Sequence, residues 1–234
     1  MKKDYTKKIK DFCDAEAIDL FGVADIAKIK DEILIRGSLL KKLNRAICLG
    51  AALAKPILEE IENQPTRLYF HHYRTVNAFL DQAALKLARI IQKEGFLALP
   101  VPASQIVDWQ QQTAHLSHKK IGLLAGLGWL GRNNLLVNDK LGSQFRLVTV
   151  LTDMDIPANK PLKKGCGSCF KCVTVCPAGA INKSAEKFDH HKCFSALKNF
   201  QKQHIVEQYI CGICVKACQM KPRLTETKLR KSVG

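Results

Sequence analysis

Eight cysteines in the last third of the sequence have a spacing that suits metal chemistry. The first four, Cys166, Cys169, Cys172 and Cys176, follow the pattern C-x2-C-x2-C-x3-C and precede Pro177. In bacterial ferredoxins this run binds 4Fe-4S clusters, and its fourth cysteine ligates the other of two clusters. The spacing therefore predicts a tight loop that places three thiolates on one cluster and directs the fourth away from it.

The second group has the same spacing, with one member displaced. Cys211, Cys214 and Cys218 match the second, third and fourth ligands of the run, and Cys193 is the one cysteine left to act as the first. Crosswise pairing of the two groups then uses every cysteine once. It predicts one cluster on Cys166, Cys169, Cys172 and Cys218, and a second on Cys176, Cys193, Cys211 and Cys214.

Structural zinc is the alternative for these cysteines. Zinc modules favour two C-x2-C pairs separated by roughly 12–20 residues, and three cysteines at successive x2 intervals fit that pattern poorly. We therefore expect two 4Fe-4S clusters that carry single electrons. The other two cysteines, Cys13 and Cys48, stand in apolar surroundings and are predicted to be small buried hydrophobic residues.

The sequence has no secretory signal and no apolar run of about 18 residues, so we expect a cytoplasmic protein without a membrane span. The net charge is +16, and residues 160–234 contain 15 Lys and Arg against 4 Asp and Glu. Part of this basic excess offsets the negative charge of two thiolate-bound clusters. The remainder favours an acidic partner protein, such as an electron donor, or nucleic acid.

Helices and strands mix through the first two thirds in an α/β or α+β pattern. Helices are expected over residues 4–17, 76–94 and 117–125, the last with Ser117 as its N-cap, and strands over residues 18–24, 46–53, 96–99, 134–137 and 145–151. The run 46–53 is apolar throughout, which is typical of a strand buried on both faces. The last two strands are expected to pair as a hairpin.

Composition changes after Asp155, where prolines and lysines replace the periodic apolar pattern. Such a segment buries little core by itself, and metal ligation can provide the missing folding energy. We therefore expect an α/β domain over residues 1–156 and a small ferredoxin-like double-cluster domain over residues 157–234.

Several stretches in the same order resemble the epoxyqueuosine reductase family and its short double-cluster relatives. They are residues 18–24, 69–77, 117–119, the turn Gly126-Leu-Gly-Trp-Leu-Gly-Arg-Asn133, residues 150–153 and both cysteine groups. The resemblance implies a flavin-reductase-like N-terminal α/β domain that binds cobalamin, to which the clusters supply electrons. It places the corrinoid beside the glycine turn, so the residues expected to face it are Gly126, Gly128, Trp129, Gly131 and Asn133. A tight turn that serves only packing is the alternative for the glycines.

Two departures from the family pattern bear on the substrate. The family's catalytic Asp falls on Gln112, which cannot deliver a proton, so His118, and after it His115, becomes the candidate proton donor. His118 could instead only pack or cap its helix. The sequence also ends near the cluster cysteines, without the helical repeats that help the family to bind tRNA, and this argues against a tRNA substrate.

Three functions remain open at this point, of which a redox sensor or scaffold is the least favoured. The first is an iron–sulfur oxidoreductase of the epoxyqueuosine reductase type, which passes electrons from two clusters to a corrinoid. The alternative is a ferredoxin-like electron carrier or activator for a partner protein, without a substrate of its own.

Overall fold

The computed structural model describes residues 4–35, 37–108 and 110–220. At its centre is a four-stranded sheet in the order β1-β2-β6-β3, formed by β1 (Leu20–Asp25), β2 (Arg45–Ala52), β6 (Phe145–Thr152) and β3 (Ala98–Val101). All three strand pairings are antiparallel. The expected mixture of helices and strands is confirmed. Because the sheet is antiparallel, the fold is α+β and not an α/β fold with parallel strands.

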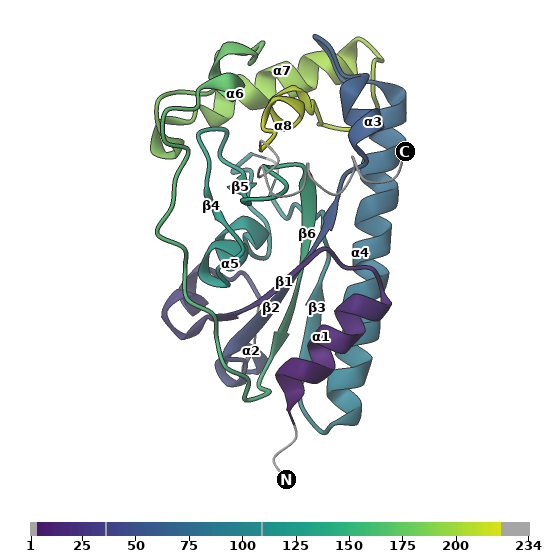
Figure 1. Ribbon diagram of the computed structural model, residues 1–234, viewed down its shortest axis with the longest axis vertical. Helices are drawn as coiled ribbons and strands as arrows, with labels where there is room; N and C mark the ends of the chain where they lie inside the picture. The colour runs from purple at the N-terminus through teal and green to yellow at the C-terminus, as the bar shows by residue number, and fades with distance from the viewer. Residues whose placement is uncertain (1–3, 36, 109, 221–234) are drawn as a thin grey trace, which may run out of the picture.

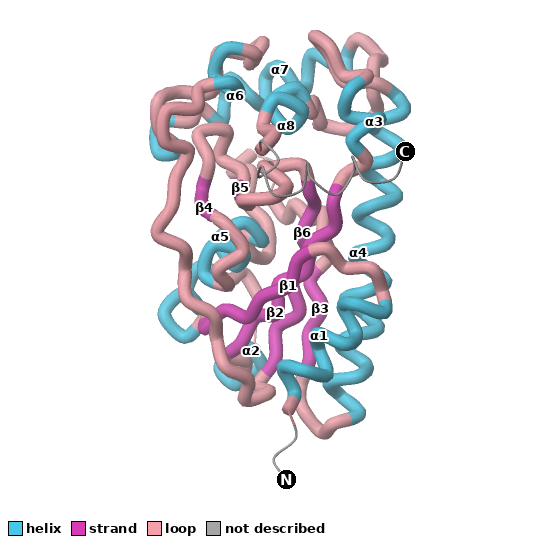
Figure 2. Tube along the Cα trace, viewed as in Figure 1, coloured by secondary structure: helices cyan, strands magenta, loops and turns pink. Residues whose placement is uncertain are grey.

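Helices cover both faces of this sheet (Figures 1 and 2). Helices α1 (Tyr5–Ala15) and α4 (Arg67–Lys93) pack on one face, and α5 (His118–Leu124) packs on the other. Along β2, Ile47 and Leu49 belong to the core on the α4 side, whereas Ala46 and Cys48 belong to the core on the α5 side. The expectation of a strand buried on both faces is therefore confirmed.

Two predicted boundaries were wrong: the start of α4, which is set by a local cap, and the end of β3. Helix α4 begins at Arg67 rather than near Val76, because the Thr66 hydroxyl accepts a hydrogen bond from the backbone N–H of Tyr69 (3.1 Å) and caps the helix. Strand β3 continues past Leu99 through Pro100, which is tolerated because β3 pairs only with β6 and is an edge strand.

The predicted hairpin was also wrong. Strand β5 (Leu136–Val137) pairs with β4 (Trp129–Leu130), inside the glycine turn, whereas β6 lies between β2 and β3 in the main sheet. A Cβ atom on Gly128 would lie 2.1 Å from the carbonyl oxygen of Val137, so β4 and β5 approach each other this closely only because residue 128 is glycine.

The cysteine-rich part lies at one end of the molecule, at the top of Figure 1. Its elements are α6 (Lys171–Thr174), η2 (Ala185–Lys187), α7 (His190–Lys202) and α8 (Ile213–Ala217), and the smaller elements of the remainder are η1 (Ala27–Glu32), α2 (Leu39–Lys42) and α3 (Lys55–Glu59). Residues 157–170 have no regular secondary structure. One hydrophobic core joins both parts, since Val206, Ile210 and Ile213 pack with Ile61 and Tyr69.

The two remaining cysteines are in the core as expected. Cys13 and Cys48 are 2% and 0% exposed, and burial raises the pKa of each thiol to about 12. Within the described residues, no helix is long and apolar enough to cross a membrane.

Candidate functional site

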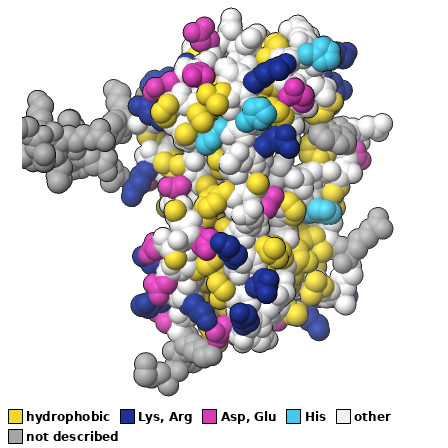
Figure 3. Space-filling model, turned by 90° about the vertical axis from the view of Figure 1, so that its right-hand side faces the viewer, with side chains coloured by type: hydrophobic (Ala, Val, Ile, Leu, Met, Phe, Trp, Pro, Cys, Tyr) yellow, Lys and Arg dark blue, Asp and Glu magenta, His cyan; other side chains and the backbone are white. Residues whose placement is uncertain are grey.

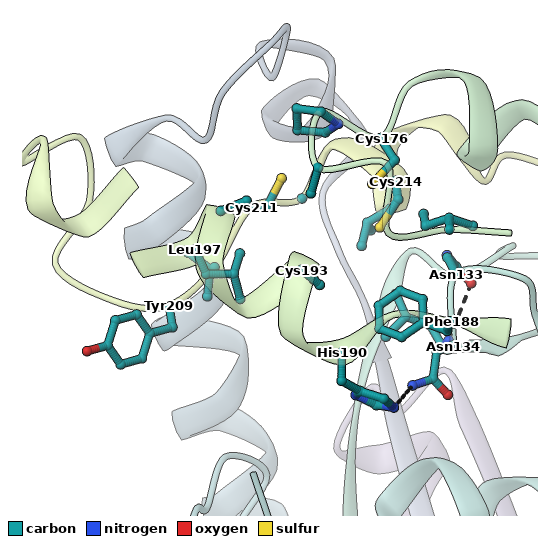
Figure 4. Close-up of a pocket in the computed structure, with 18 of the residues that line it drawn as sticks. Asn133, Asn134, Cys176, Phe188, His190, Cys193, Leu197, Tyr209, Cys211 and Cys214 are labelled. Carbon is teal, nitrogen blue, oxygen red and sulfur yellow. Dashed lines mark hydrogen bonds between the residues drawn. The ribbon is translucent and has the colours of Figure 1, made fainter. Parts of the chain in front are cut away.

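Four of the eight cysteines line one cavity of about 320 Å³ between the cysteine-rich part and the sheet. Cys176 follows α6, Cys193 belongs to α7, Cys211 precedes α8 and Cys214 belongs to α8 (Figure 4). This set is the one predicted to hold the second cluster. The volume lies in the ~300–1,000 Å³ range of small-ligand and cofactor sites, and a wall of four thiols is the donor set of a 4Fe-4S cluster.

The other four cysteines form a separate neighbourhood. Burial, together with the nearby thiols of Cys218, Cys166 and Cys169, raises the pKa of the Cys172 thiol to about 11. The structure thus brings together Cys166, Cys169, Cys172 and Cys218, although Cys172 and Cys218 are 46 positions apart in the sequence. In the described part of the chain, no three His, Cys, Asp or Glu side chains are arranged around a single metal-ion position.

Cys218 is held by the turn that precedes β6. Burial raises the pKa of its thiol, while hydrogen bonds from the Ser143 hydroxyl and backbone lower it. Gly142 has a positive φ of 60°, and a Cβ atom there would lie 1.7 Å from the Cys218 carbonyl oxygen. The side-chain amide of Gln144 also donates to the carbonyl oxygen of Lys216 (2.9 Å). The α+β part of the chain therefore positions the fourth ligand of the first group.

Arg132, in the glycine turn, binds the backbone of the first cysteine loop, residues 162–176. Its guanidinium donates to the carbonyl oxygens of Cys169 and Gly167 (2.9 Å each) and to that of Lys183 (2.8 Å), and it lies 4.0 Å from the ring centroid of Phe170. These contacts keep the loop in one conformation. They give Arg132, within the glycine turn, a structural role that the sequence pattern did not reveal.

A second cavity of about 250 Å³ adjoins the first on the side of the sheet. Ser117, His118 and Lys119 line it, and five residues line both cavities: Tyr69, Lys119, Leu135, Arg146 and Val215. The structure therefore places the second group of thiols next to the Ser-His-Lys stretch.

Arg146 and Lys119 are the cationic groups shared by the two cavities. Arg146 donates to the side-chain oxygen of Asn77 (2.9 Å) and lies 4.2 Å from the Tyr73 ring centroid, while Lys119 donates to the side-chain oxygen of Asn134 (2.8 Å). Burial lowers the pKa of Lys119. Sequence reasoning did not select Arg146, since a single arginine inside an apolar strand pattern has no motif.

Both ring nitrogens of His118 have a hydrogen-bond partner. Nε2 lies 2.7 Å from the Pro102 carbonyl oxygen and Nδ1 lies 2.8 Å from the Thr149 hydroxyl. Because a carbonyl can only accept, the neutral ring carries its proton on Nε2 and accepts from Thr149 through Nδ1. Burial lowers the pKa of His118 to about 4, so the ring is neutral at pH 7 and its proton is already bonded to Pro102. The proton-donor role of His118 stays a prediction.

We expect the stability of the protein to depend on pH through His118. The folded-state pKa of about 4 lies below the ordinary histidine pKa of 6.5, so over the range between them the unfolded chain binds a proton that the folded chain does not. The stabilisation from the neutral ring is complete above pH 6.5 and is lost as the pH falls. Between pH 7.5 and 5.0 the free energy of unfolding should fall by up to about 2 kcal/mol more in the natural protein than in His118→Gln. Anaerobic urea titrations at both pH values measure this difference, and His115→Gln is the control. An equal pH dependence in the natural protein and in His118→Gln would contradict it.

The remaining candidate residues lie in different places. His115 is exposed, its Nδ1 lies 3.3 Å from the Leu34 carbonyl oxygen, and it lines neither cavity. Asn133 lines the larger cavity, whereas Trp129 and the three glycines of the turn line neither.

The chain itself lies where the side chains of those glycines would project. A Cβ atom on Gly126 would lie 2.6 Å from the Lys160 carbonyl oxygen, and one on Gly131 would lie 2.5 Å from the Val137 side chain. Close packing thus accounts for the glycines. Their predicted position facing a corrinoid stays a prediction.

Comparison with protein families identifies residues 165–221 as a 4Fe-4S double cluster binding domain. The chain is 38% identical over 85 residues to the epoxyqueuosine reductase of Escherichia coli K12, which is 36% of this chain and 22% of that protein. It is 28% identical over 138 residues to the enzyme of Bacillus cereus, which is 56% of this chain and 36% of that protein. The matches thus span only about a fifth to a third of these relatives.

Solved structures share the fold over nearly the whole chain. A reductive dehalogenase described with a mechanism for B12-dependent dehalogenation has a TM-score of 0.75 at 18% identity, over 97% of this chain and 34% of its own. Epoxyqueuosine reductase from Streptococcus thermophilus has a TM-score of 0.61 at 17% identity, over 92% and 66%. An epoxyqueuosine reductase with a modified tRNA stem loop has a TM-score of 0.58 at 18% identity, over 92% and 64%. The chain thus has two 4Fe-4S clusters in a double-cluster domain and is related to the epoxyqueuosine reductases.

Proposed function

We propose that this protein is an iron–sulfur oxidoreductase of the epoxyqueuosine reductase type, in which two 4Fe-4S clusters supply single electrons to a corrinoid bound against the α+β part, residues 1–156. The observation that carries the proposal is the shared wall of the two cavities. Tyr69, Lys119, Leu135, Arg146 and Val215 separate the second group of thiols from the cavity of Ser117 and His118. An electron on the second cluster is therefore adjacent to a site where an acceptor can bind.

The ligand sets that we propose follow the crosswise pairing. Cys166, Cys169, Cys172 and Cys218 hold the first cluster, and Cys176, Cys193, Cys211 and Cys214 hold the second. The neighbourhoods of the thiols support this division, as does the cavity lined by the second set. Interlocked ligand sets keep the two clusters near each other, which favours electron transfer between them.

The residues around the smaller cavity fit part of a corrinoid. Its volume of about 250 Å³ holds only a portion of so large a group, so the rest would lie outside the cavity. Leu53, Phe145 and Leu147 provide apolar surface, while Lys119 and Arg146 provide donors for polar substituents. A bound corrinoid would supply a low-potential cobalt centre that transfers electrons to a substrate. Around it, Arg146 and Lys119 would orient the ligand, and the hydrogen bonds of His118 would keep the cavity wall rigid.

The substrate class belongs to the proposal as well. Fold relatives include a dehalogenase and an enzyme with a tRNA stem loop, so reductive removal of a substituent is the chemistry that they share. The flavin-reductase-like character of the N-terminal part also stays a proposal. Gln112 stands where the family has a catalytic Asp, and this separates the chain from the tRNA-modifying members at the proton-transfer step.

Corrinoid binding is the decisive experiment. Anaerobically purified protein should contain about eight iron atoms per chain and should bind about one equivalent of cob(II)alamin, detected by cobalt analysis after gel filtration and by a change in the cobalt EPR spectrum. Leu135→Trp should weaken this binding on the order of tenfold, or ~1.4 kcal/mol, because Leu135 lines both cavities. Leu130→Trp, at an exposed position of β4, is the matched control.

Either result decides the next step. Stoichiometric corrinoid directs the search to substrates, beginning with an epoxyqueuosine-containing tRNA stem loop and a halogenated phenol. Full iron content without corrinoid uptake would reject the reductase and leave the electron-carrier function.

A further inference from the structure

Among the described residues, the first cysteine loop is a strongly exposed part of the double-cluster domain. Cys169 is exposed, and the apolar side chains of Leu162, Phe170 and Val175 in the same stretch of chain are 36%, 41% and 40% exposed. The second group of thiols lines a cavity, and none of its four cysteines is exposed. A partner at the surface can therefore approach the first cluster more closely than the second.

The charged side chains of this loop are all basic. Residues 156–185 contain five lysines (Lys160, Lys163, Lys164, Lys171 and Lys183) and no Asp or Glu. Lys164 forms an ion pair with Asp139, whereas no ion pair with a described residue is found for Lys163 or Lys171. A first cluster with a charge of about −2 offsets only part of this excess.

The opposite side of the molecule has a different surface. The loop runs along the left of Figure 1, away from α4, and Figure 3 shows the α4 side with basic and acidic side chains interspersed. There several lysines pair with acids, as in Lys7–Asp11, Lys10–Asp14 and Lys86–Glu16. The first cysteine loop differs in having lysines and no acidic residue of its own.

Arg132 supports the loop. It donates to the carbonyl oxygens of Gly167 and Cys169 and lies over the ring of Phe170, so these contacts hold the apolar centre of the surface without a partner. A preorganised apolar centre with a charged rim is the form of a small, transient protein interface. Binding nucleic acid would not require an exposed cluster ligand at the centre.

We propose that the cluster-1 surface, formed by Leu162, Lys163, Cys169, Phe170, Lys171 and Val175, is the docking site of an acidic one-electron carrier protein. The proposal rests on the two-cluster part of the proposed function. In each encounter the carrier loses one electron and the first cluster is reduced from [4Fe-4S]²⁺ to [4Fe-4S]⁺, with no bond formed or broken. The second cluster would then accept this electron and could pass it to an acceptor bound in the adjoining cavity.

The test uses an acidic flavodoxin in its hydroquinone form as the probe and follows cluster reduction by stopped-flow absorbance. The second-order rate constant should fall on the order of tenfold between low and high salt, since attraction between opposite charges is screened. The double variant Lys163→Glu/Lys171→Glu should be slower on the order of tenfold at low salt. The matched double variant Lys28→Glu/Lys42→Glu, at exposed positions in η1 and α2, should remain within about twofold of the natural protein.

Rates measured at high salt distinguish an effect on docking from an effect on the reduction potential of the first cluster. The rates of the natural protein and of Lys163→Glu/Lys171→Glu should converge there if the lysines act by attraction, and they would stay apart if the substitutions changed the potential. Iron content and the EPR spectrum of each variant establish that the clusters are intact.

Equal rates at low salt would overturn the proposal. Loss of RNA binding without a change in reduction rate would assign the surface to nucleic acid instead. Neither the reduction rate nor RNA binding requires a corrinoid, so the result is independent of the proposal that this protein is a corrinoid reductase.

Discussion

Replacing Cys218 with alanine should remove the first cluster and leave the second in place. Cys218 lies beside Cys166, Cys169 and Cys172, so the substitution leaves three thiolates in that neighbourhood and four around the other cavity. Iron should fall from about eight to about four atoms per chain, because a cluster that has lost a thiolate ligand is labile. Iron analysis and low-temperature EPR of the reduced protein measure the loss.

The control for this substitution is Cys48→Ala. Cys48 is fully buried between β2 and α5, away from both groups of thiols, so this variant should keep both clusters. If Cys218→Ala instead lost the second cluster and kept the first, the crosswise pairing would be refuted, and each group of cysteines would hold its own cluster.

Substituting Gly142 should have a similar effect without removing any ligand. A Cβ atom at residue 142 would lie 1.7 Å from the Cys218 carbonyl oxygen, and the φ of 60° is itself unfavourable for alanine. Gly142→Ala must therefore displace Cys218 or the turn before β6. We expect a loss of the first cluster's EPR signal and a decrease of more than about 1 kcal/mol in the free energy of unfolding.

Gly165→Ala is the matched control, since a Cβ atom there would meet no heavy atom within 4 Å. It lies next to Cys166 in the same basic loop, so it tests whether any glycine near the ligands is sensitive. An intact first cluster in Gly142→Ala would contradict the position of Cys218 against this turn. Loss of the cluster in both variants would point to general instability of the loop.

Local patterns predicted the elements whose signal lies within a few residues. Ser117 begins α5 as its N-cap, and β2 and β6 lie close to their expected ranges, because capping and apolar runs are properties of short segments. The start of α4 and the pairing of β4 with β5 were missed. The first is set by the Thr66 cap, which lies before the periodic apolar stretch, and the second requires Gly128 to lie against Val137, which an apolar pattern does not report.

The sequence by itself determined that this chain has two 4Fe-4S clusters, since the intervals between cysteines set which thiolates one loop can present to a cluster. It also determined the buried state of Cys13 and Cys48 through their apolar neighbours. Only the tertiary structure decided that Gly142 and Ser143 hold Cys218, that Arg132 fastens the first loop, and that Arg146 lies between two cavities. These contacts join segments far apart in the chain, so their geometry depends on how the sheet, α4 and the cysteine-rich part pack, and no local pattern encodes it.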